Sequence, residues 1–143
     1  MKSKSDWRKL AAGRRKSMRD TERTEASALI AQRLFSLDTW KQASEIYMYC
    51  GYKDEVRTGE ILKRALMEGK RVAVPRVLNE KDMVFAEISS EDELDTGMFG
   101  IPEPSAEAVG RVTDITPDLI IVPCVGIDTG GNRIGHGRGY YDR

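Results

Sequence analysis

Residues 45–74 read EIYMYCGYKDEVRTGEILKRALMEGKRVAV, and their pattern decides the fold. Over 45–50, apolar residues alternate with two tyrosines, which is the period of a β-strand. Thr58 can cap a helix whose apolar residues recur at helical spacing, and Gly69 can end it. A second strand follows over 71–74. This order of strand, helix and strand predicts a βαβ unit and therefore a pair of parallel strands.

Helical patterns precede this unit. The segment 4–18 places apolar residues near one helical face and basic residues on the rest, which predicts a basic amphipathic helix. Asp20 or Thr21 can cap a second helix. The apolar residues that recur at helical spacing in this second helix are Ala26, Leu29, Ile30, Leu34 and Leu37.

Three further segments complete the expected fold. Residues 83–88 alternate as a strand does, and the uninterrupted apolar run 119–122 is typical of a strand covered on both faces in a parallel sheet. Glycines and prolines interrupt residues 96–104, which favours an ordered loop. The sequence therefore predicts an α/β domain of three layers, α/β/α, with a mainly parallel sheet and its ligand beyond the carboxyl ends of the strands.

Size and composition narrow the class of protein. The chain has 143 residues, enough for a single domain over 1–143, and its 23 basic side chains balance 23 acidic ones. This balance gives no reason to expect nucleic acid as a partner. The two cysteines, Cys50 and Cys124, lack metal-site and disulfide spacing, which favours a reducing compartment. With neither a signal peptide nor a membrane-spanning run in the sequence, we expect a soluble, cytoplasmic monomer that binds no membrane.

Glycine is concentrated towards the end of the sequence. Six of the thirteen glycines lie between Gly126 and Gly139, directly after the run 119–122. Closely spaced glycines indicate backbone that takes unusual dihedral angles or lies against a ligand. Because Arg133 and Arg138 stand beside them, the exposed amides can bind an anion, and phosphate is the natural candidate.

The generic phosphate motifs do not match this segment. Gly130 and Gly135 have the spacing of a P-loop, but His136 and Gly137 stand where lysine and serine or threonine are required. The alternation of glycines also differs from the dinucleotide-binding pattern. The alternative to a phosphate site is a flexible glycine-rich hairpin whose arginines serve solubility.

Two segments, 118–128 (DLIIVPCVGID) and 131–143 (GNRIGHGRGYYDR), resemble the signature of the 5-formyltetrahydrofolate cyclo-ligase family. Three shorter segments resemble other motifs of that family and follow in the same order: 4–8 (KSDWR), 54–58 (DEVRT) and 99–104 (FGIPEP). The resemblance therefore extends over the whole chain.

The resemblance implies an ATP-dependent enzyme that closes 5-formyltetrahydrofolate to 5,10-methenyltetrahydrofolate and converts ATP to ADP and phosphate. In the mechanism of the family, the formyl oxygen takes the γ-phosphoryl group, N10 attacks the activated carbon, and phosphate leaves. Phosphoryl transfer needs positioning and positive charge around three oxygens, which arginines and main-chain amides can supply.

The resemblance also implies the residues of the site. Those for ATP are Lys4, Ser5, Asp6, Trp7, Arg8, Arg133, Ile134, Gly135, His136, Gly137, Arg138, Gly139, Tyr140 and Tyr141. Those for the folate substrate are Cys50, Glu55, His136, Gly137, Arg138, Gly139 and Tyr140. Arg138 is the catalytic residue, and Asp142 is a ligand of Mg²⁺, a hard cation that commonly takes one or two protein carboxylates.

Several of these residues have simpler explanations. Cys50 fits a packed position in a strand, Glu55 an exposed turn, and Asp142 a helix cap. Tyr140 and Tyr141 can anchor a helix to the core instead of contacting a ligand. His136, the single histidine, can act as a general acid or base, although phosphate or substrate contact fits it better.

The family pattern continues beyond Arg143 with the rest of a helix, another strand and a further aspartate for the metal. The C-terminal segment expected for the family is therefore missing from this sequence. This departure leaves a second interpretation open, a non-catalytic protein that binds folate or a nucleotide on the same scaffold.

Overall fold

The computed structural model describes residues 3–79, 81–96, 102–105, 116–124, 126–127 and 129–135. Its helices are α1 (Lys4–Lys16), α2 (Asp20–Ser36), α3 (Asp38–Gln42) and α4 (Gly59–Met67), with a 3₁₀ turn at Glu91–Glu93. Its strands are β1 (Glu45–Met48), β2 (Arg71–Val77), β3 (Met83–Ile88), β4 (Leu94–Thr96), β5 (Pro102–Pro104), β6 (Leu119–Ile121), β7 (Gly126–Ile127) and β8 (Arg133–Ile134). Among the helices described, none is long and apolar enough to cross a bilayer.

Four strands form the central sheet in the order β3-β2-β1-β6. Strand β1 pairs in parallel with β2 and with β6, and β3 adds an antiparallel strand at the β2 edge. The crossover from β1 to β2 runs through α4, so the βαβ unit expected over 45–74 is confirmed. The expectation of a mixed α/β fold with a mainly parallel sheet is confirmed with it.

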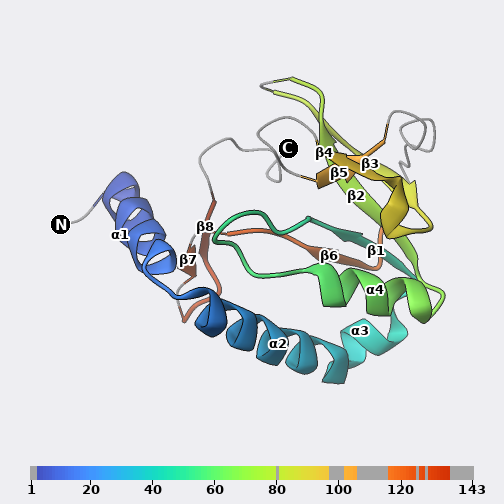
Figure 1. Ribbon diagram of the computed structural model, residues 1–143, viewed down its shortest axis with the longest axis horizontal. Coiled ribbons are helices and arrows are strands. Elements are labelled where there is room, and N and C mark those ends of the chain that lie inside the picture. The colour runs from blue at the N-terminus through green and yellow to red at the C-terminus, as the bar shows by residue number, and fades with distance from the viewer. Residues whose placement is uncertain are drawn as a thin grey trace.

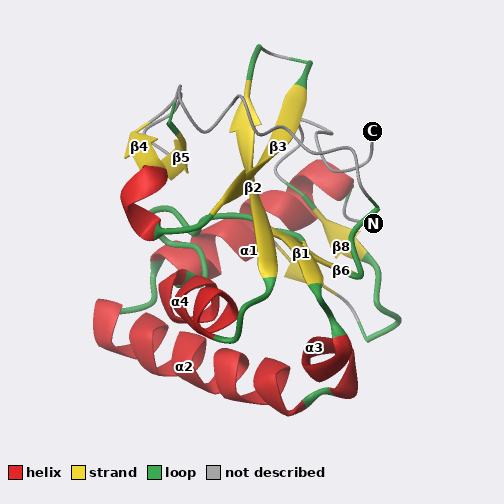
Figure 2. Cartoon of the chain, turned by 90° about the vertical axis from the view of Figure 1, so that its right-hand side faces the viewer, coloured by secondary structure: helices red, strands yellow, loops and turns green. Residues whose placement is uncertain are grey.

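The hydrophobic core lies between the sheet and one layer of helices. Ile46 and Met48 alternate with half-buried neighbours on β1 and point to this layer, where Ile61 and Ala65 of α4 and Trp40 of α3 meet them. Helices α2, α3 and α4 all lie on this side of the sheet, whereas α1 lies beyond one end of it (Figures 1 and 2). Of the two helical layers expected, the described elements contain this one.

The buried face of α2 differs from the prediction. Leu29 and Ile30 are exposed, whereas Arg23, Ser27 and Ala31 are buried. These three residues are spaced by four and share one helical face, which packs against the rest of the protein through a guanidinium and a hydroxyl group. Leu34, as predicted, and Ala31 pack on the core, and the polar contacts of Arg23 and Ser27, which an apolar count cannot detect, extend the inward face of α2.

Of the two predicted helix caps, the one for α2 was wrong and the one for α4 was right in position. Arg19 occupies the cap position of α2, and the Arg19 amide donates a 3.2 Å hydrogen bond to the Glu22 carboxylate. Asp20, one of the two residues expected to cap α2, is instead its first residue and pairs with Arg23 at 2.8 Å. Thr58 occupies the cap position of α4, as predicted, although its hydroxyl accepts a hydrogen bond from the Gly51 amide at 2.8 Å and makes no capping bond to the helix.

Two strand predictions need correction as well. Residues 102–104, expected in a loop, form β5 and pair with β4 in a separate two-stranded sheet, and the prolines are tolerated because this short strand has its only described partner on one side. Strand β6 is not covered on both faces, because Ile120 is 48% exposed. Among the described strands, β6 is an edge strand that pairs only with β1.

The parallel strands β1 and β6 end on the same side of the sheet. The chain leaves β1 into a loop over residues 49–58 and leaves β6 towards the β7–β8 hairpin. Figure 1 shows α1, β7 and β8 together at this end, beside the loop that follows β1. Ligands of open α/β sheets bind at the carboxyl ends of strands, so this end is where a site is expected.

Candidate functional site at the carboxyl ends of the strands

The first helix and the glycine-rich hairpin are joined directly. The Arg8 guanidinium donates a hydrogen bond from Nε to the Gly135 carbonyl oxygen at 2.9 Å. Gly135 directly follows β8, and a Cβ at this position would lie 3.1 Å from Arg133 Nη1. The structure therefore brings together three residues that the sequence assigned to one phosphate site.

The helix also packs closely on β7. A Cβ at Gly126 would lie 3.3 Å from the Cβ of Ala11, so a glycine there lets α1 approach the hairpin. Gly126 pairs with Ile134 across the hairpin, and Arg133 Nη1 donates to the Pro123 carbonyl oxygen at 3.3 Å. Gly126 thus lets α1 pack on the hairpin, and Arg133 ties the hairpin to the segment that follows β6.

A capping box formed by Ser3 and Asp6 closes the N-terminus of α1. The Ser3 hydroxyl accepts a 3.1 Å hydrogen bond from the Asp6 amide, and the Asp6 carboxylate accepts one of 3.0 Å from the Ser3 amide. This capping box accounts for the position of Asp6 without a ligand. Lys4, Ser5 and Trp7 are exposed on the same first turns.

A tightly built loop follows β1, over residues 51–58, and we call it the 51–58 loop. A Cβ at Gly51 would overlap the Val56 carbonyl oxygen, so only glycine fits there. Within the loop the Glu55 carboxylate accepts a 2.9 Å hydrogen bond from the Tyr52 amide, and the Glu55 amide donates to the Tyr52 carbonyl at 3.1 Å. Lys53 takes the left-handed conformation at the tip, with φ 53°.

Burial perturbs three ionisable groups where β1 leads into this loop. Burial raises the pKa of the Glu55 carboxyl, against the Tyr52 hydrogen bond and the Arg15 charge, which lower it. Burial and the nearby Glu55 raise the pKa of the Cys50 thiol to about 12, and burial and Glu55 likewise raise that of Tyr49 to about 12. Such a cluster of perturbed groups is a mark of a functional site.

Several of the predicted site residues that the structure describes form two separate clusters, and the remaining ones include residues that are not described. Arg8, Arg133 and Gly135 meet at the hairpin, and Cys50 and Glu55 lie together at the end of β1. His136, Gly137, Arg138, Gly139, Tyr140, Tyr141 and Asp142 lie outside the described residues. Within the described residues no three His, Cys, Asp or Glu side chains are grouped to hold a metal ion.

Sequence reasoning missed one link between these two groups. Arg15 Nη2 lies 3.4 Å from Asp54 Oδ1, and Arg15 Nη1 donates to the Cys124 carbonyl oxygen at 3.3 Å. Arg15 follows Arg8 by seven residues, so both lie on one face of α1, and this spacing is the available signal. The spacing shows that Arg8 and Arg15 share a helix face, but it does not predict which residues of other segments contact Arg15.

The fold and the site together define a mixed α/β protein whose candidate ligand site lies where its parallel strands end. The model of the 5-formyltetrahydrofolate cyclo-ligase family matches residues 1–143, and the chain belongs to that family. It is 35% identical over 119 residues to a probable 5-formyltetrahydrofolate cyclo-ligase of Schizosaccharomyces pombe, covering 81% of this chain and 58% of the relative. It is 33% identical over 129 residues to the 5-formyltetrahydrofolate cyclo-ligase of Mus musculus, covering 85% of this chain and 63% of the relative. The chain thus spans about three-fifths of these relatives' length.

Solved structures agree with this family assignment. The NMR structure of Aquifex aeolicus 5,10-methenyltetrahydrofolate synthetase matches with a TM-score of 0.78 and 30% identity, over 98% of this chain and 70% of that one. The structure of a 5,10-methenyltetrahydrofolate synthetase from Mycoplasma pneumoniae has a TM-score of 0.69 at 20% identity, over 99% of this chain and 76% of that one, and supports the fold alone.

Proposed function

We propose that the protein closes 5-formyltetrahydrofolate to 5,10-methenyltetrahydrofolate at the expense of ATP. The formyl oxygen attacks the γ-phosphorus and the bond to ADP breaks. N10 then attacks the activated carbon, phosphate leaves with the original formyl oxygen, and the N10 proton passes to phosphate or water. The family membership supports this reaction, and the 2.9 Å bond between Arg8 and Gly135 is the observation that carries it, because it joins the two segments assigned to ATP.

The nucleotide half of the site is formed by α1 and the glycine-rich segment. Arg8 and Arg133 provide positive charge, and main-chain amides of the segment provide further donors for phosphate oxygens. Because phosphoryl transfer depends mainly on positioning and charge, a rigid link between these groups favours catalysis. The proposal keeps Arg138 as the catalytic residue. The remaining residues proposed for ATP are Lys4, Ser5, Asp6, Trp7, Ile134, Gly135, His136, Gly137, Gly139, Tyr140 and Tyr141.

The folate half lies at the end of β1. Glu55 is proposed to accept paired N–H bonds from the pterin, which a carboxylate does in bidentate fashion. Cys50 contributes apolar contact instead of nucleophilic attack, because its thiol is buried and its pKa is about 12.

Magnesium is part of the proposal through Asp142 alone. Mg²⁺ held by Asp142 would neutralise charge on the phosphates, and because this ion often retains several waters, one or two protein carboxylates would suffice. Asp142 follows the glycine-rich segment in sequence, which suits this role. The described carboxylates contribute no grouped set of ligands, and the steps above depend on none of them for the metal.

The test is a spectroscopic assay of the purified chain. With Mg²⁺, ATP and 5-formyltetrahydrofolate we expect the absorbance of methenyltetrahydrofolate to rise, and to stay flat when ATP is omitted. Calorimetry with each ligand runs in parallel. A folded chain that binds 5-formyltetrahydrofolate without ATP-dependent turnover would instead be a non-catalytic binding protein.

A further inference from the structure

Arg15 occupies the point where the two halves of the proposed site meet. Its guanidinium contacts the 51–58 loop through Asp54 at 3.4 Å and the segment after β6 through the Cys124 carbonyl at 3.3 Å. On the same face of α1, one and two turns earlier, Ala11 faces Gly126 and Arg8 donates to Gly135. One helix face thus contacts both the glycine-rich hairpin and the loop of Glu55.

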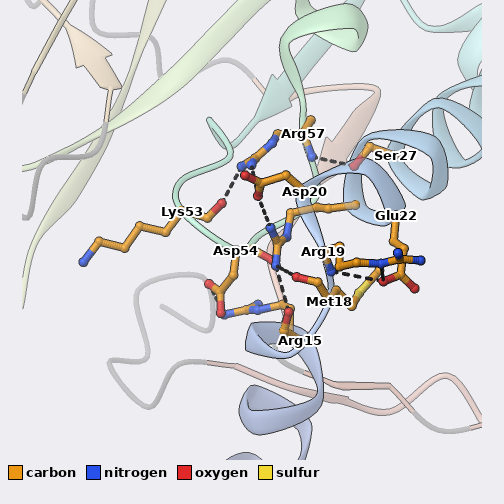
Figure 3. A network of polar contacts seen from close by, with 10 residues as sticks. Arg15, Met18, Arg19, Asp20, Glu22, Ser27, Lys53, Asp54 and Arg57 are labelled. Carbon is orange, nitrogen blue, oxygen red and sulfur yellow. Dashed lines mark hydrogen bonds and ion pairs between the residues drawn. The ribbon is translucent and has the colours of Figure 1, made fainter.

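Arg23 fixes the main chain on both sides of this pair. This arginine of α2 is 7% exposed and donates from Nη2 to the Arg15 carbonyl at 2.9 Å and from Nε to the Asp54 carbonyl at 3.2 Å. It also donates to Asp20 at 2.8 Å and to the Met18 carbonyl at 3.2 Å. Figure 3 shows Arg15 and Asp54 side by side within this network, between the end of α1 and the loop that carries Lys53.

The Arg15–Asp54 pair is a poor stabilising contact. Both side chains are mostly buried, at 19% and 18% exposed, so bringing their charges together has a desolvation cost. Arg15 Nε and Asp54 Oδ2 are buried, and neither atom has a hydrogen-bond partner among the described residues. By comparison, the Arg64–Glu68 pair at the end of α4 has a shorter distance, 2.6 Å, and its side chains are more exposed to solvent. Buried polar atoms without a hydrogen-bond partner cost free energy, so the placement of this pair calls for an explanation other than stability.

Glu55 is the group that this pair acts on. Within the part of the chain that the structure describes, the charged and titratable groups that act on its carboxyl include Arg15 from α1, the adjacent Asp54, and Tyr49 and Cys50 just after β1. The Arg15 charge lowers the pKa of Glu55, and Asp54 raises it. The two members of the pair thus act on Glu55 in opposite directions.

We propose that Arg15 is a positioning residue for the folate half of the site: it holds the 51–58 loop and the segment of Cys124 against α1 and presents its positive charge to Glu55. The inference rests on the proposed function, in which the Glu55 carboxylate binds the pterin. It assigns a role to a residue outside the sets proposed to bind ATP and folate. The consequence is that α1, which carries Arg8, and the loop that carries Glu55 move as one unit.

The experiment follows the Glu55 carboxyl by ¹³C NMR between about pH 4 and pH 9, a range that spans the ordinary carboxyl pKa and an upward shift from it. The signal is assigned by its loss in Glu55→Gln. Arg15→Gln is expected to raise the pKa of Glu55, and Asp54→Asn to lower it. Arg64→Gln, which breaks the outlying pair of α4, is the matched control and leaves it unchanged.

Kinetics provide the second readout. In Arg15→Gln we expect kcat/KM for 5-formyltetrahydrofolate to fall at pH values below the raised Glu55 pKa, by about tenfold or more, and to recover at higher pH as Glu55 ionises. Arg15→Lys keeps the charge, and its pH profile stays close to that of the wild type. A merely structural loss would not recover at alkaline pH.

The outcomes separate the inference from the proposed function. Opposite shifts in Arg15→Gln and Asp54→Asn support it, even if the wild type shows no turnover and the proposed function fails. Identical titrations of Glu55 in folded wild type, Arg15→Gln and Asp54→Asn would overturn it. A tenfold loss in Arg15→Gln that is the same at every pH would overturn it too.

Discussion

Arg8 and Gly135 are 127 positions apart in sequence, and the arginine Nε lies 2.9 Å from the glycine carbonyl oxygen. The bond ties the first helix of the chain to the end of its last described strand. Since both segments lie beyond the carboxyl ends of β1 and β6, the fold brings basic side chains and glycine-rich backbone to one place.

Arg8→Ala removes this link, and we expect kcat/KM for ATP to fall by about 10- to 100-fold, the equivalent of losing one hydrogen bond to a charged group. Steady-state kinetics with ATP varied measure the effect. Lys9→Ala, at the exposed neighbouring position, is the control and keeps near-normal kinetics. Equal rates for the two variants would remove Arg8 from the ATP site.

Arg138→Ala and Asp142→Ala test the residues assigned to catalysis and to the metal. Each variant is expected to lose about two or more orders of magnitude in kcat, because stabilising charge on the transferring phosphoryl group is the largest catalytic contribution. Single-turnover measurements at saturating ATP separate this loss from weaker binding. A near-normal rate in either variant would exclude that residue from the site.

Gly51→Ala tests the construction of the 51–58 loop. A Cβ there collides with the Val56 carbonyl oxygen, so we expect a loss of about 1–3 kcal/mol in the free energy of unfolding and weaker folate binding. Gly59→Ala is the matched control, because a Cβ at Gly59 meets nothing within 4 Å and alanine favours the helix. Urea denaturation of both variants measures the difference. Equal stabilities would show that the loop shifts freely.

Glu55→Gln separates stability from function. Burial raises the pKa of Glu55 in the folded state, so the stability that its proton provides is present below the ordinary value of 4.5 and is lost as the pH rises through the folded pKa. The glutamine variant should therefore have the higher melting temperature above the folded pKa, an advantage that disappears below about pH 4.5. It should also lose folate affinity. Thermal unfolding across this pH range is the measurement, and a constant difference at every pH would contradict the assignment.

Cys50 should be chemically inert in the folded protein. A thiol with a pKa of about 12 instead of 9.0 has about a thousandfold less thiolate near pH 8, and Cys50 is also 8% exposed. We expect iodoacetamide to label it at least about 100-fold more slowly in the native chain than in denaturant, as followed by mass spectrometry. Rapid native labelling would instead indicate a reactive cysteine.

The sequence predicted what local periodicity encodes. The alternation of Ile46 and Met48 and the apolar stripe of α4 specify the βαβ unit without reference to anything distant, and β3 was predicted with its bounds. The buried face of α2 was not predictable in this way. Arg23 is buried because carbonyls of α1 and of the 51–58 loop surround it, and those partners come together only in the folded chain.

The candidate site shows the same division. Arg8, Arg133 and Gly135 were selected by motif, and their convergence at the strand ends agrees with the general rule for open α/β sheets. Arg15 and Asp54 carry no motif of their own. Their importance lies in a contact between α1 and a loop far along the chain, and spacing within one helix cannot predict such a contact.

The central claim is that the first helix and the glycine-rich segment together bind the phosphates of ATP next to the folate loop. A crystal structure of the protein with a non-hydrolysable ATP analogue and 5-formyltetrahydrofolate tests it most directly. We predict phosphate oxygens within about 3 Å of Arg8 and of main-chain amides between Arg133 and Tyr141, with the pterin against Glu55. Phosphates bound on another face of the sheet, away from both Arg8 and Gly135, would contradict the account.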